Sequence, residues 1–348
     1  MKQRQKQDQF NPINERVKYQ YRSYLKRVLK KDEKTVLKAL EYLRVFELFT
    51  NFADFATYNN AQANKYIDHL FDENFSLSFI NNATRDLKDF LTWLERQKGY
   101  RSKIKYDDIG YLNITNNQRR ASKTTEYKKS YTYAQMIQTI RLMPEVEMIE
   151  RRNKAMISVD ALCGLRISEL RTIKIKNLIF EDGVWFVHAN PKDMLVKNST
   201  SRYSPPVQLP QDITDNVINW RNELIQKHGF KDKDPLFPKI PRSFNWQNLL
   251  ESEITKEEMR SSSAVRSIFE TAFKAAGFEY INPHNFRHTR ARFAAKQSPE
   301  YLNATRQALG HKTIDTTLNS YGELSFEEQK VIISGVKIEI LKTPTSQC

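Results

Sequence analysis

Residues 282–321 read NPHNFRHTRARFAAKQSPEYLNATRQALGHKTIDTTLNSY, and this segment alone predicts several short helices in succession. One helix is expected over 285–296 and the next over 300–309. Gly310 follows the second, and glycine is the residue that most readily ends a helix in the left-handed conformation. A short Thr-rich helix then leads to Tyr321. The segment therefore indicates a mainly helical fold.

The same segment concentrates side chains that are suited to phosphate chemistry. His284 and Arg287 lie three positions apart, so a helix places both on one face. His311 lies in the junction between two helices, ten positions before Tyr321. A guanidinium can hold phosphate oxygens, a histidine can move protons near neutral pH, and a tyrosine can attack phosphorus. Taken alone, however, a His-x-x-Arg pattern is more often a pair of surface charges than a site.

A second group of informative residues lies upstream. The apolar stretch NKAMISVDALC predicts a buried helix that ends at Gly164, and Arg166 follows directly. ISELRTI predicts another short helix, with Glu169 one turn after Arg166. IKIKNLIF and VWFVHAN predict two strands joined at an Asp-Gly turn, which is a favourable hairpin connection. A third strand is expected at SPPVQL, and its two prolines favour the edge of the sheet.

Apolar spacing predicts helices elsewhere in the chain as well. Ser78 is expected to cap the N-terminus of the helix that begins with it. The segments with helical periodicity are 35–55, 60–70, 78–97, 212–228 and 261–276, the last two followed by Gly229 and Gly277.

Taken together, GLRISEL, HNFRHT and LGHKTIDTTLNSY resemble the tyrosine recombinase, or integrase, family. That family has an Arg in a GLR-S-E-L setting, an H-x-L-R-H-T helix, an LGH junction and a nucleophilic Tyr soon afterwards. The resemblance covers about 131–325 and extends more loosely to the helices before it. It implies a mainly α fold with a small antiparallel β-sheet. An N-terminal helical core-binding (SAM-like) domain would precede a tyrosine-recombinase catalytic domain.

The resemblance implies a role for each matching residue. Tyr321 would be the nucleophile that forms a 3′-phosphotyrosyl bond, although its interval from His311 is about one residue longer than in the family. Arg166 and Arg287 would hold the scissile phosphate, and His284 would accept the proton of the phenol. The chemistry would need no metal, no ATP and no other cofactor, because cationic side chains stabilise the charge that develops on phosphate.

Two positions have supporting or alternative assignments. Glu169 resembles an acid of the family that orients an active-site base or arginine, although a surface ion pair with Arg171 or Lys174 remains the alternative. In the family, a Lys on a β-hairpin turn gives a proton to the leaving 5′-oxygen. Lys192, directly after the strand VWFVHAN, is preferred here over Lys197, which lies deeper in the turn.

Positive charge is concentrated in two blocks. Of the net charge of +15, residues 1–35 contribute eleven Lys or Arg against four acids, and residues 98–130 contribute nine against three. Such blocks favour contact with a polyanion, because each neutralised phosphate releases condensed counterions. The residues expected to contact DNA are Arg119, Arg120, Lys123, Lys128 and Lys129.

The resemblance and the charge pattern together suggest an organisation in five parts. They are a basic N-terminal arm (1–30), a helical DNA-clamping domain (31–98), a basic linker (99–130), the catalytic domain (131–325) and a C-terminal segment (326–348). The last segment either packs on a neighbouring protomer or caps its own domain. The implied partners are double-stranded DNA, a dimer on each site, a tetramer during strand exchange, and accessory DNA-bending or directionality proteins.

Other features narrow the functional class. The two cysteines, Cys163 and Cys348, have no metal-ligand spacing, and no apolar run approaches the length of a membrane span. A cytoplasmic protein associated with the bacterial nucleoid is therefore expected, with no membrane partner. The resemblance implies a site-specific DNA recombinase or integrase, which would integrate or excise a mobile genetic element or resolve chromosome dimers. The alternatives are a type IB topoisomerase-like enzyme, a hairpin-forming resolvase, or a non-catalytic DNA-binding regulator with the same fold.

Overall fold

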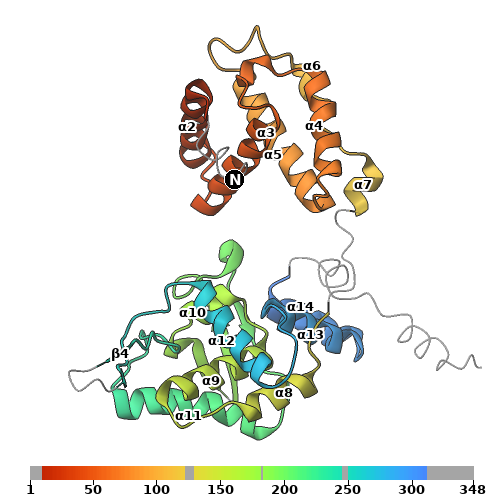
Figure 1. The fold of residues 1–348 in the computed structure, drawn as a ribbon. Helices are drawn as coiled ribbons and strands as arrows, with labels where there is room; N and C mark the ends of the chain where they lie inside the picture. The colour runs from red at the N-terminus through yellow and green to blue at the C-terminus, as the bar shows by residue number, and fades with distance from the viewer. Residues whose placement is uncertain (1–9, 122–128, 182, 245–249, 312–348) are drawn as a thin grey trace, which may run out of the picture. The chain divides into compact units, whose positions relative to one another are not determined.

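A computed structural model describes residues 10–121, 129–181, 183–244 and 250–311 (Figure 1). The chain divides into two compact units, Met1–Thr125 and Glu126–Cys348, which we call the N-terminal and the C-terminal unit. The fold is mostly helical with a small three-stranded antiparallel sheet, so the expected fold class is confirmed. No helix within the described ranges combines the length and the apolar character needed to cross a membrane.

The described part of the N-terminal unit is entirely helical. Its core is built from apolar side chains that recur at helical spacing, above all on α3 and α5. Ser76, rather than the expected Ser78, caps α5 by accepting a hydrogen bond from the backbone N–H of Phe79. The elements are α2 (Pro12–Arg27), α3 (Glu33–Phe49), η1 (Phe55–Thr57), α4 (Asn60–Asp72), α5 (Leu77–Glu95), α6 (Tyr106–Ile109) and α7 (Asn116–Ala121).

The structure extends this unit beyond the stretch 31–98 in both directions. The expected arm contains helix α2, in which Val17, Tyr21 and Leu25 are buried in the core. These residues recur every four positions, a stripe that is easily missed because most of its neighbours are charged or polar. The stretch expected to be a linker begins within the core too, because Ile104, Ile109, Leu112 and Ile114 are buried there.

The C-terminal unit surrounds helix α9, which is buried along most of its length and packs along α11. The helices are α8 (Tyr133–Leu142), α9 (Met148–Cys163), α10 (Ile167–Thr172), η2 (Ile175–Asn177), η3 (Lys197–Ser199), α11 (Gln211–His228), α12 (Ser262–Ala275), α13 (His284–Ala295) and α14 (Pro299–Leu309). The expected buried helix ending at Gly164 and the helices expected near 212–228, 261–276, 285–296 and 300–309 are all confirmed within one or two residues.

The sheet is built from β1 (Leu178–Glu181), β2 (Val184–Ala189) and β3 (Arg202–Ser204) in the order β1-β2-β3, all antiparallel. The hairpin between the first two strands is confirmed by the pairing of Glu181 with Val184. The expected third strand at SPPVQL is wrong, because β3 ends where the prolines begin. Proline cannot donate to a strand ladder, and the backbone N–H of Val207 instead binds the carbonyl of Leu162 on α9. A further hairpin, β4 (Arg242–Phe244) with β5 (Leu250–Ser252), was not expected.

Candidate active site

The site is formed where the C-terminal ends of two helices meet. Helix α9 ends at Gly164 with φ of +61°, and helix α14 ends at Gly310 with φ of +66°. The last carbonyl groups of a helix have no partner within it and carry the negative end of the helix dipole. Both glycines are flanked by buried arginines. The two ends therefore supply acceptors for cationic side chains.

Arg287 joins these two helix ends from α13. Its guanidinium is fully buried, and it donates to the carbonyl of Gly164 through Nη1 and to that of Leu309 through Nη2. Nη2 also lies 3.3 Å from Nε2 of His311, which acts as the acceptor because a guanidinium can only donate. Arg287 thus fixes the junction after α14 against the end of α9.

Arg290 lies one turn further along α13 and binds the same region. Its Nη1 donates to the carbonyl of Cys163 at 2.6 Å, and its Nη2 donates to that of Pro205 at 2.8 Å. The spacing of three from Arg287 places both arginines on one helix face. That spacing was the signal that could have identified Arg290 from the sequence.

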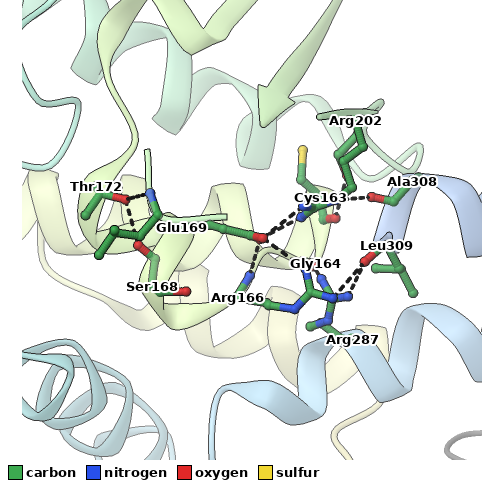
Figure 2. Close-up of polar contacts among 12 residues, drawn as sticks. Cys163, Gly164, Arg166, Ser168, Glu169, Thr172, Arg202, Arg287, Ala308 and Leu309 are labelled. Atoms are coloured by element: carbon green, nitrogen blue, oxygen red, sulfur yellow. Dashed lines mark hydrogen bonds and ion pairs between the residues drawn. The ribbon is translucent and has the colours of Figure 1, made fainter. Parts of the chain in front are cut away.

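Glu169 is a buried carboxylate that two arginines share (Figure 2). Arg202 donates to Oε1 at 2.9 Å and to Oε2 at 2.6 Å. Arg166 donates to Oε1 through Nη1 at 3.0 Å and to Oε2 through its backbone N–H at 2.8 Å. Burial by itself would raise the pKa of Glu169, but the hydrogen bonds and charge of Arg202, with the charges of Arg287 and Arg166, lower the pKa to about 2. The carboxylate is therefore ionised at neutral pH.

His311 follows Gly310 directly and is buried beside the cationic groups. Burial, followed by the charges of Arg287 and Arg166, lowers the pKa of His311 to about 3. Its imidazole is therefore neutral at physiological pH. The carbonyl of the same residue accepts a hydrogen bond from Nη1 of Arg306 at 3.0 Å, which further fixes the junction.

A cavity of about 440 Å³ opens at this junction. Most of its polar lining is cationic or able to donate hydrogen bonds, which suits an anion better than an apolar ligand. The lining residues are Arg166, Lys197, Thr200, Ser201, Arg202, Tyr203, Arg306, Gln307, Gly310 and His311.

The structure thus brings together four of the residues expected in the site: Arg166, Glu169, Arg287 and His311. His284 is the exposed first residue of α13, and its ring lies edge-on to that of His288 with 5.3 Å between centroids. Its charge is near enough to contribute to the lowered pKa of His311. Tyr321 lies outside the described residues.

The two candidate lysines are placed differently. Lys197 begins η3 in the loop between β2 and β3 and lines the cavity. Lys192 is exposed earlier in the same loop, where its backbone N–H binds the side chain of Asn190, and it does not line the cavity. Arg202 is a site residue that the sequence did not indicate, because its partners are distant in the chain.

The residues expected to contact DNA are described only in part. Arg119 and Arg120 are exposed on α7 in the N-terminal unit. Lys129 is exposed in the C-terminal unit and forms an ion pair with Glu279 at 3.2 Å. Lys123 and Lys128 lie outside the described residues. Within the described ranges, no group of three or more His, Cys, Asp or Glu side chains could hold a metal ion.

Comparisons with known proteins identify the family of this chain. The model of the phage integrase family matches residues 131–328. The chain is 24% identical over 180 residues to the tyrosine recombinase XerC of Lactobacillus leichmannii, a match that covers 52% of this chain and 53% of the relative. The chain thus spans about half the length of that relative.

Two solved structures have the same fold. The XerH site-specific recombinase bound to a palindromic difH substrate, in a post-cleavage complex, has a TM-score of 0.65 at 17% identity, and the match covers 90% of this chain and 84% of that one. A lambda integrase dimer bound to a COC′ core site has a TM-score of 0.59 at 15% identity, covering 94% and 99%.

Proposed function

The chain belongs to the phage integrase family, and on that premise we propose that it is a site-specific DNA recombinase. It cleaves and rejoins DNA through a 3′-phosphotyrosyl intermediate on Tyr321. The observation that carries this proposal is the convergence of Arg166, Arg287 and His311 at one junction, where a cationic cavity opens. Arg166 lies more than a hundred positions before Arg287 and His311 in the chain, so only the fold brings it to them.

The proposed step conserves the energy of the DNA backbone. The phenol oxygen of Tyr321 attacks phosphorus, the bond from phosphorus to the 5′-oxygen breaks, and the phenol proton passes to His284. The departing 5′-oxygen takes up a proton from a lysine. Rejoining is the reverse step with the 5′-hydroxyl of a second strand, so ATP is not required. The proposal assigns no role to a metal ion or another cofactor.

The arginines stabilise the transition state electrostatically. Negative charge develops on the non-bridging oxygens of phosphorus, and a preorganised guanidinium stabilises that charge without having to reorient. Arg166 and Arg287 are preorganised because Glu169 and the carbonyls of Gly164 and Leu309 hold them in place. Arg166 therefore lines the cavity in a fixed position before DNA binds, and the buried Arg287 adds its positive charge to the same junction.

We propose Lys197, rather than the initially preferred Lys192, as the proton donor to the 5′-oxygen. Lys197 lines the same cavity as Arg166 and His311, whereas Lys192 does not. Its loop is joined to the site by β3, where Arg202 binds Glu169. Lys197 also lies deeper in the turn than Lys192, further from the end of β2.

The proposed partner is double-stranded DNA. In support, the XerH and lambda integrase structures of the same fold are described as complexes with DNA sites, and the latter as a dimer. We propose that the N-terminal unit clamps the DNA, with Arg119 and Arg120 of α7 contacting the backbone. We also propose a dimer on each site and a tetramer during strand exchange. Residues 326–348, expected either to pack on a neighbouring protomer or to cap their own domain, lie outside the described residues. Accessory DNA-bending or directionality proteins would bind neighbouring DNA.

The test is covalent capture on DNA that contains a nick just past the cleavage position, so that the released fragment cannot rejoin. DNA from the flanks of the gene is incubated with the full chain in EDTA, and a complex resistant to SDS is expected. Tyr321→Phe should abolish the complex and leave DNA binding intact, whereas the control Tyr301→Phe, on the exposed face of α14, should not.

Three results would contradict the proposal. DNA binding without any covalent complex would indicate a non-catalytic regulator. A covalent complex in Tyr321→Phe would mean that the nucleophile is another residue. Relaxation of a single supercoiled plasmid, without joining of two sites, would indicate a topoisomerase-like enzyme instead.

A further inference from the structure

Arg202 on β3 contacts three separate parts of the site. Its Nε donates to the carbonyl of Ala308 at 2.9 Å, at the end of α14. Both of its Nη atoms bind the carboxylate of Glu169 on α10. The side chain itself packs against Gly310, next to His311. A single guanidinium therefore joins a strand, the start of one helix and the end of another.

We propose that Arg202 is a positioning residue for DNA cleavage, which acts by holding Arg166 and the Gly310–His311 junction in the geometry that phosphate requires. This inference rests on the proposed function. Arg202 is not assigned a catalytic role, because its guanidinium is already bound to Glu169 and Ala308 on two edges. It acts on phosphate only through its neighbours.

The first contribution of Arg202 is to the charge of the site. Glu169 is fully buried and also binds Arg166. If Glu169 had Arg166 as its only partner, the carboxylate would neutralise the charge that Arg166 presents to phosphate. With Arg202 present, two guanidiniums share one carboxylate, so a positive charge remains for the substrate. Arg202 thereby allows Glu169 to orient Arg166 without cancelling its charge.

The second contribution is to the path of the chain. A Cβ placed on Gly310 would lie 2.9 Å from Cδ of Arg202, so the backbone of the junction passes directly over this side chain. The hydrogen bond to Ala308 fixes the residue two positions earlier. If the side chain of Arg202 is shortened, Gly310 loses the side chain that packs against it, and the carbonyl of Ala308 loses its hydrogen-bond donor. His311 would then shift relative to Arg287.

The test compares rates of covalent capture for single and double variants. Arg202→Gln is expected to slow formation of the covalent complex by about 100-fold, the effect typical of a misplacement of about 1 Å. Its affinity for uncleaved DNA should stay within about twofold, because the outer surface is unchanged. The control Arg151→Gln breaks an ion pair with Glu223 of similar length, 2.7 Å, outside the cavity, and should cleave at nearly the rate of the unmodified chain.

A double variant distinguishes positioning from general loss of structure. In an Arg166→Ala background, Arg202→Gln should slow capture only about threefold further, because residues that act as one unit have non-additive effects. The same 100-fold loss in both backgrounds would overturn the inference. So would capture by Arg202→Gln at the rate of the control Arg151→Gln.

A neutral pair covers the case in which Arg202→Gln fails to fold because Glu169 loses its partner. Glu169→Gln combined with Arg202→Met removes both charges together. This variant should still be slowed by at least about tenfold, because the contacts with Ala308 and Gly310 are lost. Capture at the unmodified rate would mean that Arg202 only neutralises Glu169, and the inference would be wrong. Absence of capture by the unmodified chain would instead overturn the proposed function itself.

Discussion

Three glycines with similar backbone conformation but different surroundings provide a quantitative test of how the site is packed. Gly229, Gly164 and Gly310 end helices with φ of +63°, +61° and +66°. A Cβ on Gly229 would meet nothing within 4 Å. On Gly164 it would lie 3.2 Å from Leu309 and 3.3 Å from Arg290, and on Gly310 it would lie 2.9 Å from Arg202. Replacing each with alanine therefore adds the same methyl group to three increasingly crowded sites.

The size of the effect follows from two contributions. The left-handed conformation costs a residue with Cβ about 1–2 kcal/mol, and this part is common to all three variants. Overpacking adds roughly 1–3 kcal/mol where neighbours cannot move. Arg202 cannot move freely, because Glu169 and Ala308 hold its guanidinium. We expect about 1–2 kcal/mol for Gly229→Ala, about 2–5 kcal/mol for Gly310→Ala, and a value between them for Gly164→Ala.

Thermal and guanidinium denaturation of the three full-length variants measures these differences. In a unit of this size, roughly 2–4 °C of Tm corresponds to 1 kcal/mol, so Gly310→Ala should melt several degrees below Gly229→Ala. Covalent capture on DNA is measured in parallel. Gly310→Ala should lose activity even where it remains folded, because Arg202 and His311 are displaced.

Equal melting points for Gly229→Ala and Gly310→Ala would refute this reasoning. They would show that Arg202 relaxes at no cost and does not restrain the junction. Full cleavage activity in Gly310→Ala would refute the link between packing and chemistry, even if the variant were less stable.

Three further predictions concern protons. Lys197→Ala should slow cleavage of ordinary DNA, but not of DNA in which sulfur replaces the 5′-bridging oxygen, because a thiolate leaves without a proton. Lys192→Ala should cleave both substrates at normal rates. The rates of covalent capture on the two substrates test this prediction. In the folded protein the pKa of His311 is about 3, below its ordinary value of 6.5. Between pH 3 and pH 6.5, only the unfolded protein therefore binds this proton, and the stability of the folded protein falls as the pH falls. In guanidinium titrations at pH 5–6, the stability of the unmodified chain relative to His311→Gln should therefore fall by about 1 kcal/mol per pH unit as the solution is acidified, and a constant difference would contradict the buried neutral imidazole. Burial raises the pKa of Asp160 well above 3.8, so at pH values just above 3.8 this carboxyl holds its proton in the folded protein but not in the unfolded one. The stability of the unmodified chain therefore falls as the pH rises. In the same titrations, Asp160→Asn should become more stable relative to the unmodified chain between pH 4 and pH 6.

The parts of the fold that could be predicted are those specified by local signals. Gly164 and Gly310 lie directly after apolar helical segments, and a left-handed glycine ends a helix whatever surrounds it. The Asp-Gly turn likewise needs only its two neighbouring strands. The motifs around Arg166 and Arg287 were informative because each also depends on local structure: Arg166 directly precedes a short helix, and Arg287 shares a helix face with His284.

The parts that could not be predicted depend on contacts distant in the sequence. Arg202 binds Glu169, which lies 33 positions before it, and Ala308, which lies 106 positions after it. Nothing in its immediate sequence distinguishes it from an exposed arginine in a strand. The choice between Lys192 and Lys197 could not be predicted for the same reason. The cavity is formed by the β2–β3 loop together with the end of α14, so the sequence of the loop alone does not show which lysine lines it. The buried stripe of helix α2 was missed because polar residues outnumber its members.

The buried cations raise the question of how so much positive charge is tolerated in a folded unit. Arg202, Arg287 and Arg290 are all buried, and Glu169 is the carboxylate in the ion pairs seen among the described residues of the site. Most of the other acceptors are carbonyl groups at the C-terminal ends of α9 and α14, together with that of Pro205. Such carbonyls carry only partial negative charge, so they accept hydrogen bonds from guanidinium without neutralising it. A second carboxylate in their place would lower the positive charge of the site by one. Holding arginines with helix ends therefore leaves an excess of positive charge in the site, which the phosphate of the substrate can complete.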